Sequence, residues 1–183
     1  MAKKLYLVRH GQAAPAGVLV GRADYELTED GQAEIGALRE SLKKVNFSCA
    51  FVSPLMRTRQ TLSILLDQAD IPVIIEPGLI EISLGRWDGL TKEEIISAWP
   101  EKWAQRGVDI INTRPPDGES FRDLAQRVWP VFDRIKELAQ DLTLVVSHQA
   151  VNRVILAREM NLPLEALMTI PQPTGAVTVL DVE

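Results

Sequence analysis

Short apolar segments alternate with segments of helical periodicity along this chain of 183 residues. Three apolar runs, at residues 5–8, 49–52 and 142–146, have the continuity of strands buried on both faces, and residues 73–75 are predicted to form a further short strand. Between them, apolar residues recur at spacings of three and four, which is typical of amphipathic helices. A late strand is expected at residues 177–179, at a sheet edge. This alternation predicts an α/β fold with a mainly parallel sheet that helices cover on both faces.

Capping residues indicate where several helices begin. Thr28 precedes a first turn with two acidic residues, and Ser120 precedes the longest helical repeat. Ser53 and Pro54 follow the second strand directly. They are predicted to be the N-cap and the first-turn proline of a helix that runs to about residue 66.

Composition argues against several classes of protein. The formal net charge is −5, so there is no overall basic field to attract nucleic acid or a membrane surface. The single cysteine, Cys49, cannot form an intramolecular disulfide. No apolar stretch has the length of a signal-peptide core or of a membrane span. We therefore expect one domain over residues 1–183 in the cytoplasm, with no nucleic-acid or membrane partner, while the oligomeric state stays open.

Both histidines of the chain follow predicted strands. His10 comes after Arg9 at the end of the first strand, and His148 follows the fourth strand. Arg57 lies in the first turn of the helix predicted after the second strand. Ligands of open α/β sheets bind outside the carboxyl ends of the strands, so these four side chains are expected to meet in one site. One such histidine is often structural, but two beside arginines favour a functional site.

Two histidines and two arginines suit the chemistry of a phosphoryl group. The guanidinium groups of Arg9 and Arg57 can bind its oxygens with forked donors. One neutral imidazole can attack phosphorus, while the other donates hydrogen bonds to the charge that builds on the oxygens. A leaving alkoxide also needs a proton. Glu81, in a glycine-containing loop, is one candidate donor among many carboxylates, with Asp24 and Glu119 next.

Metal-assisted hydrolysis is the competing chemistry. Two histidines and an acidic residue can ligate zinc, but the chain has no His-Glu-x-x-His pair, and its arginines would repel a cation. The glycine patterns that bind nucleoside triphosphates and dinucleotides are also missing from the sequence. The residues therefore predict a site without a metal and without a cofactor.

Several segments, in the same order along the chain, resemble the histidine phosphatase superfamily, the phosphoglycerate mutase-like proteins. These segments are Arg9-His10-Gly11, residues 24–31 (DYELTEDG), 53–61 (SPLMRTRQT), 81–89 (EISLGRWDG), 118–121 (GESF) and 147–148 (SH). The resemblance covers residues 5 to about 153 and implies a three-layer α/β/α sandwich and no metal. It implies that His10 is the phosphohistidine nucleophile and that Glu81 is the general acid. The phosphate pocket that it implies is formed by Arg9, Arg57 and His148.

Some positions depart from the family pattern. Ala13 and Ala16 stand where many members carry Thr or Ser and Asn, so any phosphate contacts of those side chains are missing. Arg22 is a candidate to replace these contacts. Gln149 occupies the place of a common glycine and, together with Arg153, resembles the fructose-2,6-bisphosphatase branch.

The function expected is that of a metal-independent phosphomonoesterase, a hydrolase that acts on a small phosphorylated metabolite through a phosphohistidine. A sugar phosphate, a bisphosphate and an α-ribazole phosphate-like compound all remain open as substrates. Trp87, in the loop of Glu81, is expected to bind substrate together with Arg22 and Gln149. The chain lacks the longer middle region of phosphoglycerate mutases, which favours transfer to water. The alternatives are a phosphoglycerate mutase-type phosphotransferase and a weakly active phosphate-binding or regulatory protein on the same fold.

Overall fold

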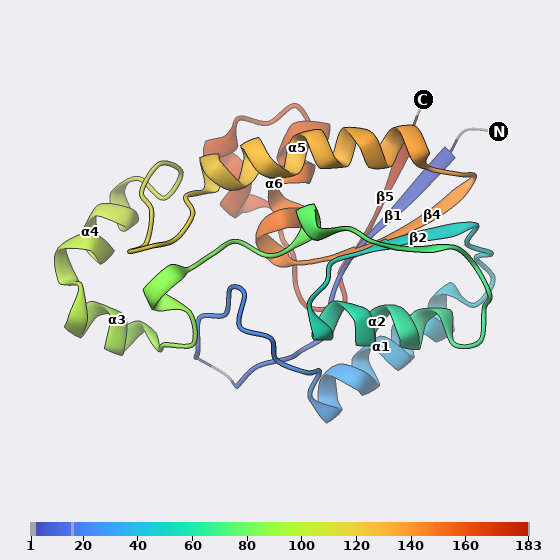
Figure 1. The fold of residues 1–183 in the computed structure, drawn as a ribbon, viewed down its shortest axis with the longest axis horizontal. Helices are drawn as coiled ribbons and strands as arrows, with labels where there is room; N and C mark the ends of the chain where they lie inside the picture. Colours follow the sequence, from blue (N-terminus) through green and yellow to red (C-terminus); the bar gives the residue numbers. More distant parts are fainter. Residues whose placement is uncertain (1–2, 16, 183) are drawn as a thin grey trace.

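The computed structural model describes residues 3–15 and 17–182 and contains a five-stranded sheet (Figure 1). The strand order is β3-β2-β4-β1-β5, in which the first four strands run parallel and β5 pairs antiparallel with β1 at one edge. The strands are β1 (Lys3–Arg9), β2 (Cys49–Val52), β3 (Val73–Ile75), β4 (Leu142–Ser147) and β5 (Val177–Val182). They include all five predicted segments, so the mainly parallel sheet and its late edge strand are confirmed.

Side chains of the central strands alternate between two hydrophobic clusters, one on each face of the sheet. In β1, Leu5 and Leu7 belong to one cluster and Val8 belongs to the other. In β4, Val145 and Val146 divide in the same way. Because successive strand residues point to opposite faces, two buried faces require an unbroken apolar run. This requirement explains why these strands are so conspicuous in the sequence.

Two pairs of helices form the outer layers of a three-layer α/β/α sandwich. These are α1 (Glu29–Leu42) with α2 (Met56–Leu66) on one face of the sheet, and α5 (Phe121–Leu138) with α6 (Gln149–Glu159) on the other (Figure 1). The phosphoglycerate mutase-like architecture that the resemblance implied is therefore confirmed. No helix within residues 3–15 and 17–182 has both the length and the apolar character needed to cross a membrane.

Two of the predicted helix starts are confirmed by their capping hydrogen bonds. The Thr28 hydroxyl accepts the Gly31 N–H at 3.0 Å at the start of α1. At the start of α5, Ser120 and Asp123 form a reciprocal capping box. These bonds satisfy backbone donors that the first turn of a helix otherwise leaves free.

Two short helices, α3 (Lys92–Ala98) and α4 (Pro100–Val108), lie beyond the sheet (Figure 1). Pro100 is the first residue of α4, where its missing N–H is not needed for an intrahelical bond. The segment between β3 and α3 was predicted as a loop, and it contains two short 3-10 turns, Pro77–Leu79 and Gly85–Trp87. This segment carries Glu81 towards the carboxyl ends of the strands.

The predicted start of α2 is wrong. The helix begins at Met56, and its N-cap residue Leu55 makes no side-chain capping hydrogen bond. The carboxylate of Asp24, from a distant loop, accepts the Met56 N–H at 2.6 Å instead. The Ser53 hydroxyl forms a hydrogen bond with Nε2 of His148 at 2.7 Å. A partner that is remote in the sequence therefore replaces the local cap and leaves Ser53 to interact with a site residue.

Candidate active site

One cavity of about 570 Å³ adjoins the carboxyl end of β1 and the first turns of α2 and α6. Its lining includes a set that we call the charged part, made up of Arg9, His10, Arg57 and Glu81. His148 is fully buried beside it, with its ring centroid 5.1 Å from that of His10. The structure thus brings together the five residues that were predicted to be catalytic. Among residues 3–15 and 17–182, no three His, Cys, Asp or Glu side chains gather in a way that would hold a metal ion.

One hydrogen bond decides the tautomer of His10. Its Nδ1 lies 2.6 Å from the carbonyl oxygen of Gly11. A carbonyl can only accept, so Nδ1 carries the ring hydrogen and Nε2 keeps its lone pair. The Nε–H of Arg57 donates to Nε2 at 3.2 Å. The nitrogen with the lone pair therefore faces the guanidinium that would hold a phosphoryl group.

The position of Gly11 has a steric cause. A Cβ at this residue would lie 2.7 Å from the carbonyl oxygen of Gly31, at the start of α1. The Gly11 N–H donates to the Thr61 hydroxyl of α2 at 3.2 Å. The main chain after β1 therefore packs tightly between α1 and α2. This packing fixes the Gly11 carbonyl, which orients His10.

Burial keeps both imidazoles neutral. Burial and the positive charge of Arg57 lower the pKa of His10 to about 3. Burial above all, together with the positive charge of Arg57, lowers the pKa of His148 well below its usual value. Desolvation disfavours the charged form of an imidazole, and a nearby cation disfavours it further. At neutral pH, His10 is therefore in the form that can act as a nucleophile.

Backbone carbonyls hold the two arginines in place. Arg57 is 1% exposed and donates to the carbonyl oxygens of Ala23 at 2.8 Å and Gly21 at 2.7 Å. Arg9 donates to the carbonyl oxygen of Gln172. Neither guanidinium forms a direct ion pair with a carboxylate in the part of the chain that the structure describes. Their positive charge is therefore available to a phosphoryl group.

Glu81 is a buried carboxyl group, 6% exposed, next to these cations. Its two oxygens accept the Ile82 N–H at 2.8 Å and the Ala150 N–H, at the start of α6, at 3.2 Å. Burial raises the pKa of Glu81, although these hydrogen bonds and the charges of Arg57 and Arg9 act in the opposite direction. A carboxyl group whose pKa is raised can hold the proton that a leaving oxygen requires.

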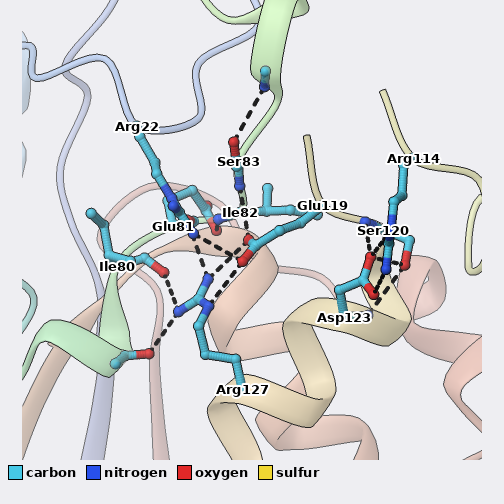
Figure 2. A network of polar contacts seen from close by, with 12 residues as sticks. Arg22, Ile80, Glu81, Ile82, Ser83, Arg114, Glu119, Ser120, Asp123 and Arg127 are labelled. Carbon is cyan, nitrogen blue, oxygen red and sulfur yellow. Dashed lines mark hydrogen bonds and ion pairs between the residues drawn. The ribbon is translucent and has the colours of Figure 1, made fainter. Parts of the chain in front are cut away.

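A salt-bridge network fixes the backbone of the Glu81 segment (Figure 2). Glu119, just before α5, accepts from Arg22 at 2.9 Å, from Arg127 at 3.1 Å and from the Ser83 N–H at 3.0 Å. Arg22 and Arg127 also donate to the carbonyl oxygen of Glu81, at 3.1 and 3.4 Å. Burial alone would raise the pKa of Glu119, but the hydrogen bonds from Arg127 and Ser83 lower it. Glu119 is therefore an ionised anchor for this segment.

The remaining predicted binding residues differ in position. Arg22 lies in the network of Glu119 and is not among the described residues that line the cavity. Gln149 and Trp87 both belong to the lining, and the Trp87 side chain is otherwise fully buried. Ala13 also belongs to the lining, whereas Ala16 lies outside the described residues.

A second set of lining residues was mostly not predicted from the sequence. This set, which we call the apolar wall, consists of Trp87, Trp103, Ile110 and Phe121. The rings of Trp87 and Trp103 pack with centroids 5.5 Å apart, and the Arg106 guanidinium lies over the rings of Trp87 and Phe121. Positions 103, 106 and 110 also follow a helical spacing of i, i+3 and i+7. That spacing could have predicted that these three residues share one face of α4 and of the segment after it.

Known proteins are similar in sequence to most of this chain. The family model of the histidine phosphatase superfamily (branch 1) matches residues 5–183. The adenosylcobalamin/alpha-ribazole phosphatase of Salmonella typhimurium is 31% identical over 183 residues, covering 98% of this chain and 90% of that protein. The 2,3-bisphosphoglycerate-dependent phosphoglycerate mutase of Bartonella tribocorum is 34% identical over 139 residues, covering 72% of this chain and 68% of that protein.

A solved structure has the same fold. The crystal structure of the alpha-ribazole phosphatase from Shigella flexneri matches with a TM-score of 0.92 and 28% identity, covering 98% of this chain and 91% of that chain. The match to this structure and the match to the family model lead to the same superfamily. This chain belongs to branch 1 of the histidine phosphatase superfamily.

Proposed function

We propose that this protein is a metal-independent phosphomonoesterase in which His10 forms a phosphohistidine and Glu81 is the general acid. The state of His10 carries the proposal. Its ring is neutral, its Nδ1–H is held by Gly11, and its Nε2 lone pair faces Arg57. This is the protonation state and orientation that attack on phosphorus requires.

In the first step, the lone pair on Nε2 of His10 forms a bond to phosphorus as the ester P–O bond breaks. Glu81 transfers its proton to the leaving oxygen, so the product departs as a neutral alcohol. The phosphorylated ring keeps its hydrogen on Nδ1 and carries a positive charge. The hydrogen bond to the Gly11 carbonyl stabilises that charge.

In the second step, the Glu81 carboxylate accepts a proton from water as the water oxygen bonds to phosphorus. The P–N bond breaks, and its electron pair returns to Nε2 of His10. Arg9 and Arg57 bind the phosphoryl oxygens throughout, and His148 donates a hydrogen bond to them. Both steps use the same groups, and the cycle ends with neutral His10 and protonated Glu81.

The apolar wall supports a substrate whose leaving group has a flat or extended apolar surface. Tryptophan and phenylalanine rings favour burial of such a surface. Two relatives are named as alpha-ribazole phosphatases, so α-ribazole phosphate is the first metabolite to test. Transfer to water rather than to a second substrate is supported by length, because this chain spans 90% of the phosphatase relative but 68% of the mutase relative.

The covalent step is tested by trapping. Rapid alkaline quenching of the enzyme with ³²P-labelled 4-nitrophenyl phosphate is expected to yield an acid-labile, base-stable label on His10. The variant His10→Asn is the matched control and should carry no label. A label on His148 would reverse the two roles, and no label on either ring would mean direct attack by water.

Metal independence and the mutase alternative each need one further measurement. Hydrolysis of the aryl phosphate is expected to survive exhaustive treatment with EDTA. Loss of activity that Mg²⁺ or Zn²⁺ restores would contradict the metal-free mechanism.

Incubation with 3-phosphoglycerate and 2,3-bisphosphoglycerate should yield inorganic phosphate or no product, whereas formation of 2-phosphoglycerate would identify a mutase.

A further inference from the structure

The two imidazoles of the site are held by partners of different chemistry. The partner of His10 is the Gly11 carbonyl, which can only accept and therefore dictates one tautomer. The partner of His148 is the Ser53 hydroxyl, 2.7 Å from Nε2. A hydroxyl can donate or accept, so this contact alone permits either tautomer of His148.

The surroundings of the pair favour one of these tautomers. Ser53 and His148 are both fully buried. Among the described residues, the Ser53 hydroxyl forms one hydrogen bond, and that bond is to His148. Nδ1 of His148 is buried without a hydrogen-bond partner within residues 3–15 and 17–182. If Nε2 carried the hydrogen, the buried Ser53 hydrogen would lack an acceptor, and Nδ1 would present a lone pair to an incoming anion. If Ser53 donates to Nε2, the ring hydrogen lies on Nδ1. An acceptor oxygen next to Nδ1 would then satisfy the last unpaired donor of the pair.

A phosphoryl group on His10 would supply that acceptor. The ring centroids of His10 and His148 are 5.1 Å apart, so a phosphoryl oxygen attached to Nε2 of His10 comes within reach of the second ring. Ionised phosphoryl oxygens only accept hydrogen bonds, and they gain negative charge in the transition state. Because burial keeps His148 neutral, it has a single ring hydrogen, and the position of that hydrogen decides whether it can help.

We propose that Ser53 is a positioning residue, which donates to Nε2 of His148 and thereby keeps the ring hydrogen on Nδ1 for a phosphoryl oxygen. This inference rests on the proposed function. It also gives a role to the serine that looks like a helix cap but is not one, since Asp24 receives the Met56 N–H at the start of α2.

The kinetic test compares two buried serines at neighbouring strand ends. Ser53→Ala removes the donor to His148. Ser147→Ala is the matched control, because Ser147 is equally buried and adjacent to His148 in sequence, but its hydroxyl donates to the Leu79 carbonyl. We expect Ser53→Ala to lower kcat/KM for 4-nitrophenyl phosphate about 10- to 100-fold, the range expected for one unsatisfied buried polar group. Ser147→Ala should stay close to the wild type.

The tautomer can be observed directly by NMR. The chain contains two histidines, so uniform ¹⁵N-histidine labelling gives two imidazole rings to assign. Both without ligand and with inorganic phosphate bound, the wild type is expected to show Nδ1–H and unprotonated Nε2 on both rings. In Ser53→Ala without ligand, the ring of His148 should become a mixture of tautomers, while His10 stays unchanged and confirms that the variant is folded.

Each result decides a specific point. An Nε2–H tautomer of His148 in the wild type, without ligand or with phosphate bound, would overturn the role of Ser53, and so would equal kinetics for the two serine variants. If the wild type neither hydrolyses aryl phosphates nor forms phosphohistidine, the proposed function fails instead. The tautomer of His148 measured without ligand still decides the role of Ser53 in that case, because no phosphoryl oxygen is then present to impose Nδ1–H, and it does so even if Ser53→Ala does not fold.

Discussion

The charged part and the apolar wall line the same cavity but are held by different kinds of interaction. Every member of the charged part hydrogen-bonds to the main chain, through carbonyl oxygens for the imidazole and guanidinium groups and through N–H groups for the carboxyl. The apolar wall consists of side chains that pack against one another. Backbone anchors cannot change without moving the main chain of the segments that carry them, whereas packed side chains can be exchanged singly. We therefore expect the rate of reaction to depend on the charged part and the choice of substrate to depend on the wall.

The strongest test of this division removes the nucleophile. His10→Asn leaves the apolar wall intact and is expected to lower kcat for an aryl phosphate by at least about 10⁴-fold, because loss of a covalent nucleophile removes the pathway itself. Steady-state kinetics on the folded variant measure the effect. Activity within about 10-fold of the wild type would mean that the charged part does not act as described.

Glu81→Gln separates proton transfer from attack. It keeps the size of the side chain and removes the transferable proton, so alkyl phosphates should react about 10²- to 10⁴-fold more slowly. Aryl phosphates should lose much less, because a phenolate leaves without a proton. Comparison of kcat for glycerol phosphate and 4-nitrophenyl phosphate measures the difference. Equal losses for both substrates, with lower thermal stability, would show that Glu81 only holds its segment in place.

His10 and Glu81 together predict a pH–rate profile in which a different residue causes the fall in activity on each side. The pKa of His10 is lowered to about 3, so kcat/KM should fall only as the pH drops to that value and the nucleophile becomes protonated. The pKa of Glu81 is raised by burial, so alkyl phosphate hydrolysis should fall as the pH rises and the acid is lost. Glu81→Gln should abolish this basic limb and leave the acidic limb in place. A basic limb that persists in the variant would assign the acid elsewhere.

Arg127→Met tests whether the network of Figure 2 positions the acid. Arg127 bonds to Glu119 and to the carbonyl oxygens of Gly78, Ile80 and Glu81. Its loss should slow alkyl phosphates about 10- to 100-fold by misplacing Glu81, with a smaller effect on aryl phosphates.

The matched control for this variant is Arg114→Met, which breaks the ion pair between the exposed Arg114 and the half-buried Asp123 near the same helix end (Figure 2). That change should alter kcat little, because exposed pairs contribute about 0–1 kcal/mol to stability and this one holds no cavity residue. Similar kinetics for the two variants would remove the network from the positioning of Glu81.

The smallest expected effect concerns the apolar wall. Trp103→Ala should raise KM for 2-naphthyl phosphate about 5- to 30-fold, which corresponds to about 1–2 kcal/mol of lost apolar contact. KM for methyl phosphate should change little. Trp99→Ala is the control, because Trp99 is also partly buried near α4 but is not among the described residues that line the cavity. A uniform fall in kcat for both substrates would contradict the division between rate and selectivity.

The gathering of the predicted catalytic residues followed from two general rules. Apolar runs predicted the strands, and parallel strands bring their carboxyl ends to one edge of the sheet, which is where Arg9, His10 and His148 lie. Glu81 was only one carboxylate among many until the family resemblance singled it out. The apolar wall was missed because its residues come from separate segments, and only their packing beyond the sheet shows which of them face the cavity.

The sequence by itself determined which elements form, because burial on one or two faces imposes a period on apolar residues that can be read locally. It also determined that two histidines follow strands. The tertiary structure alone decided which of several competing partners each polar group takes. Ser53 bonds to His148 and not to its own helix, because Asp24 provides the acceptor there, and Arg22 bonds to Glu119 outside the cavity. Hydrogen bonds and desolvation act through space, so partner choice and the low pKa of His10 follow from which groups are close once the chain is folded.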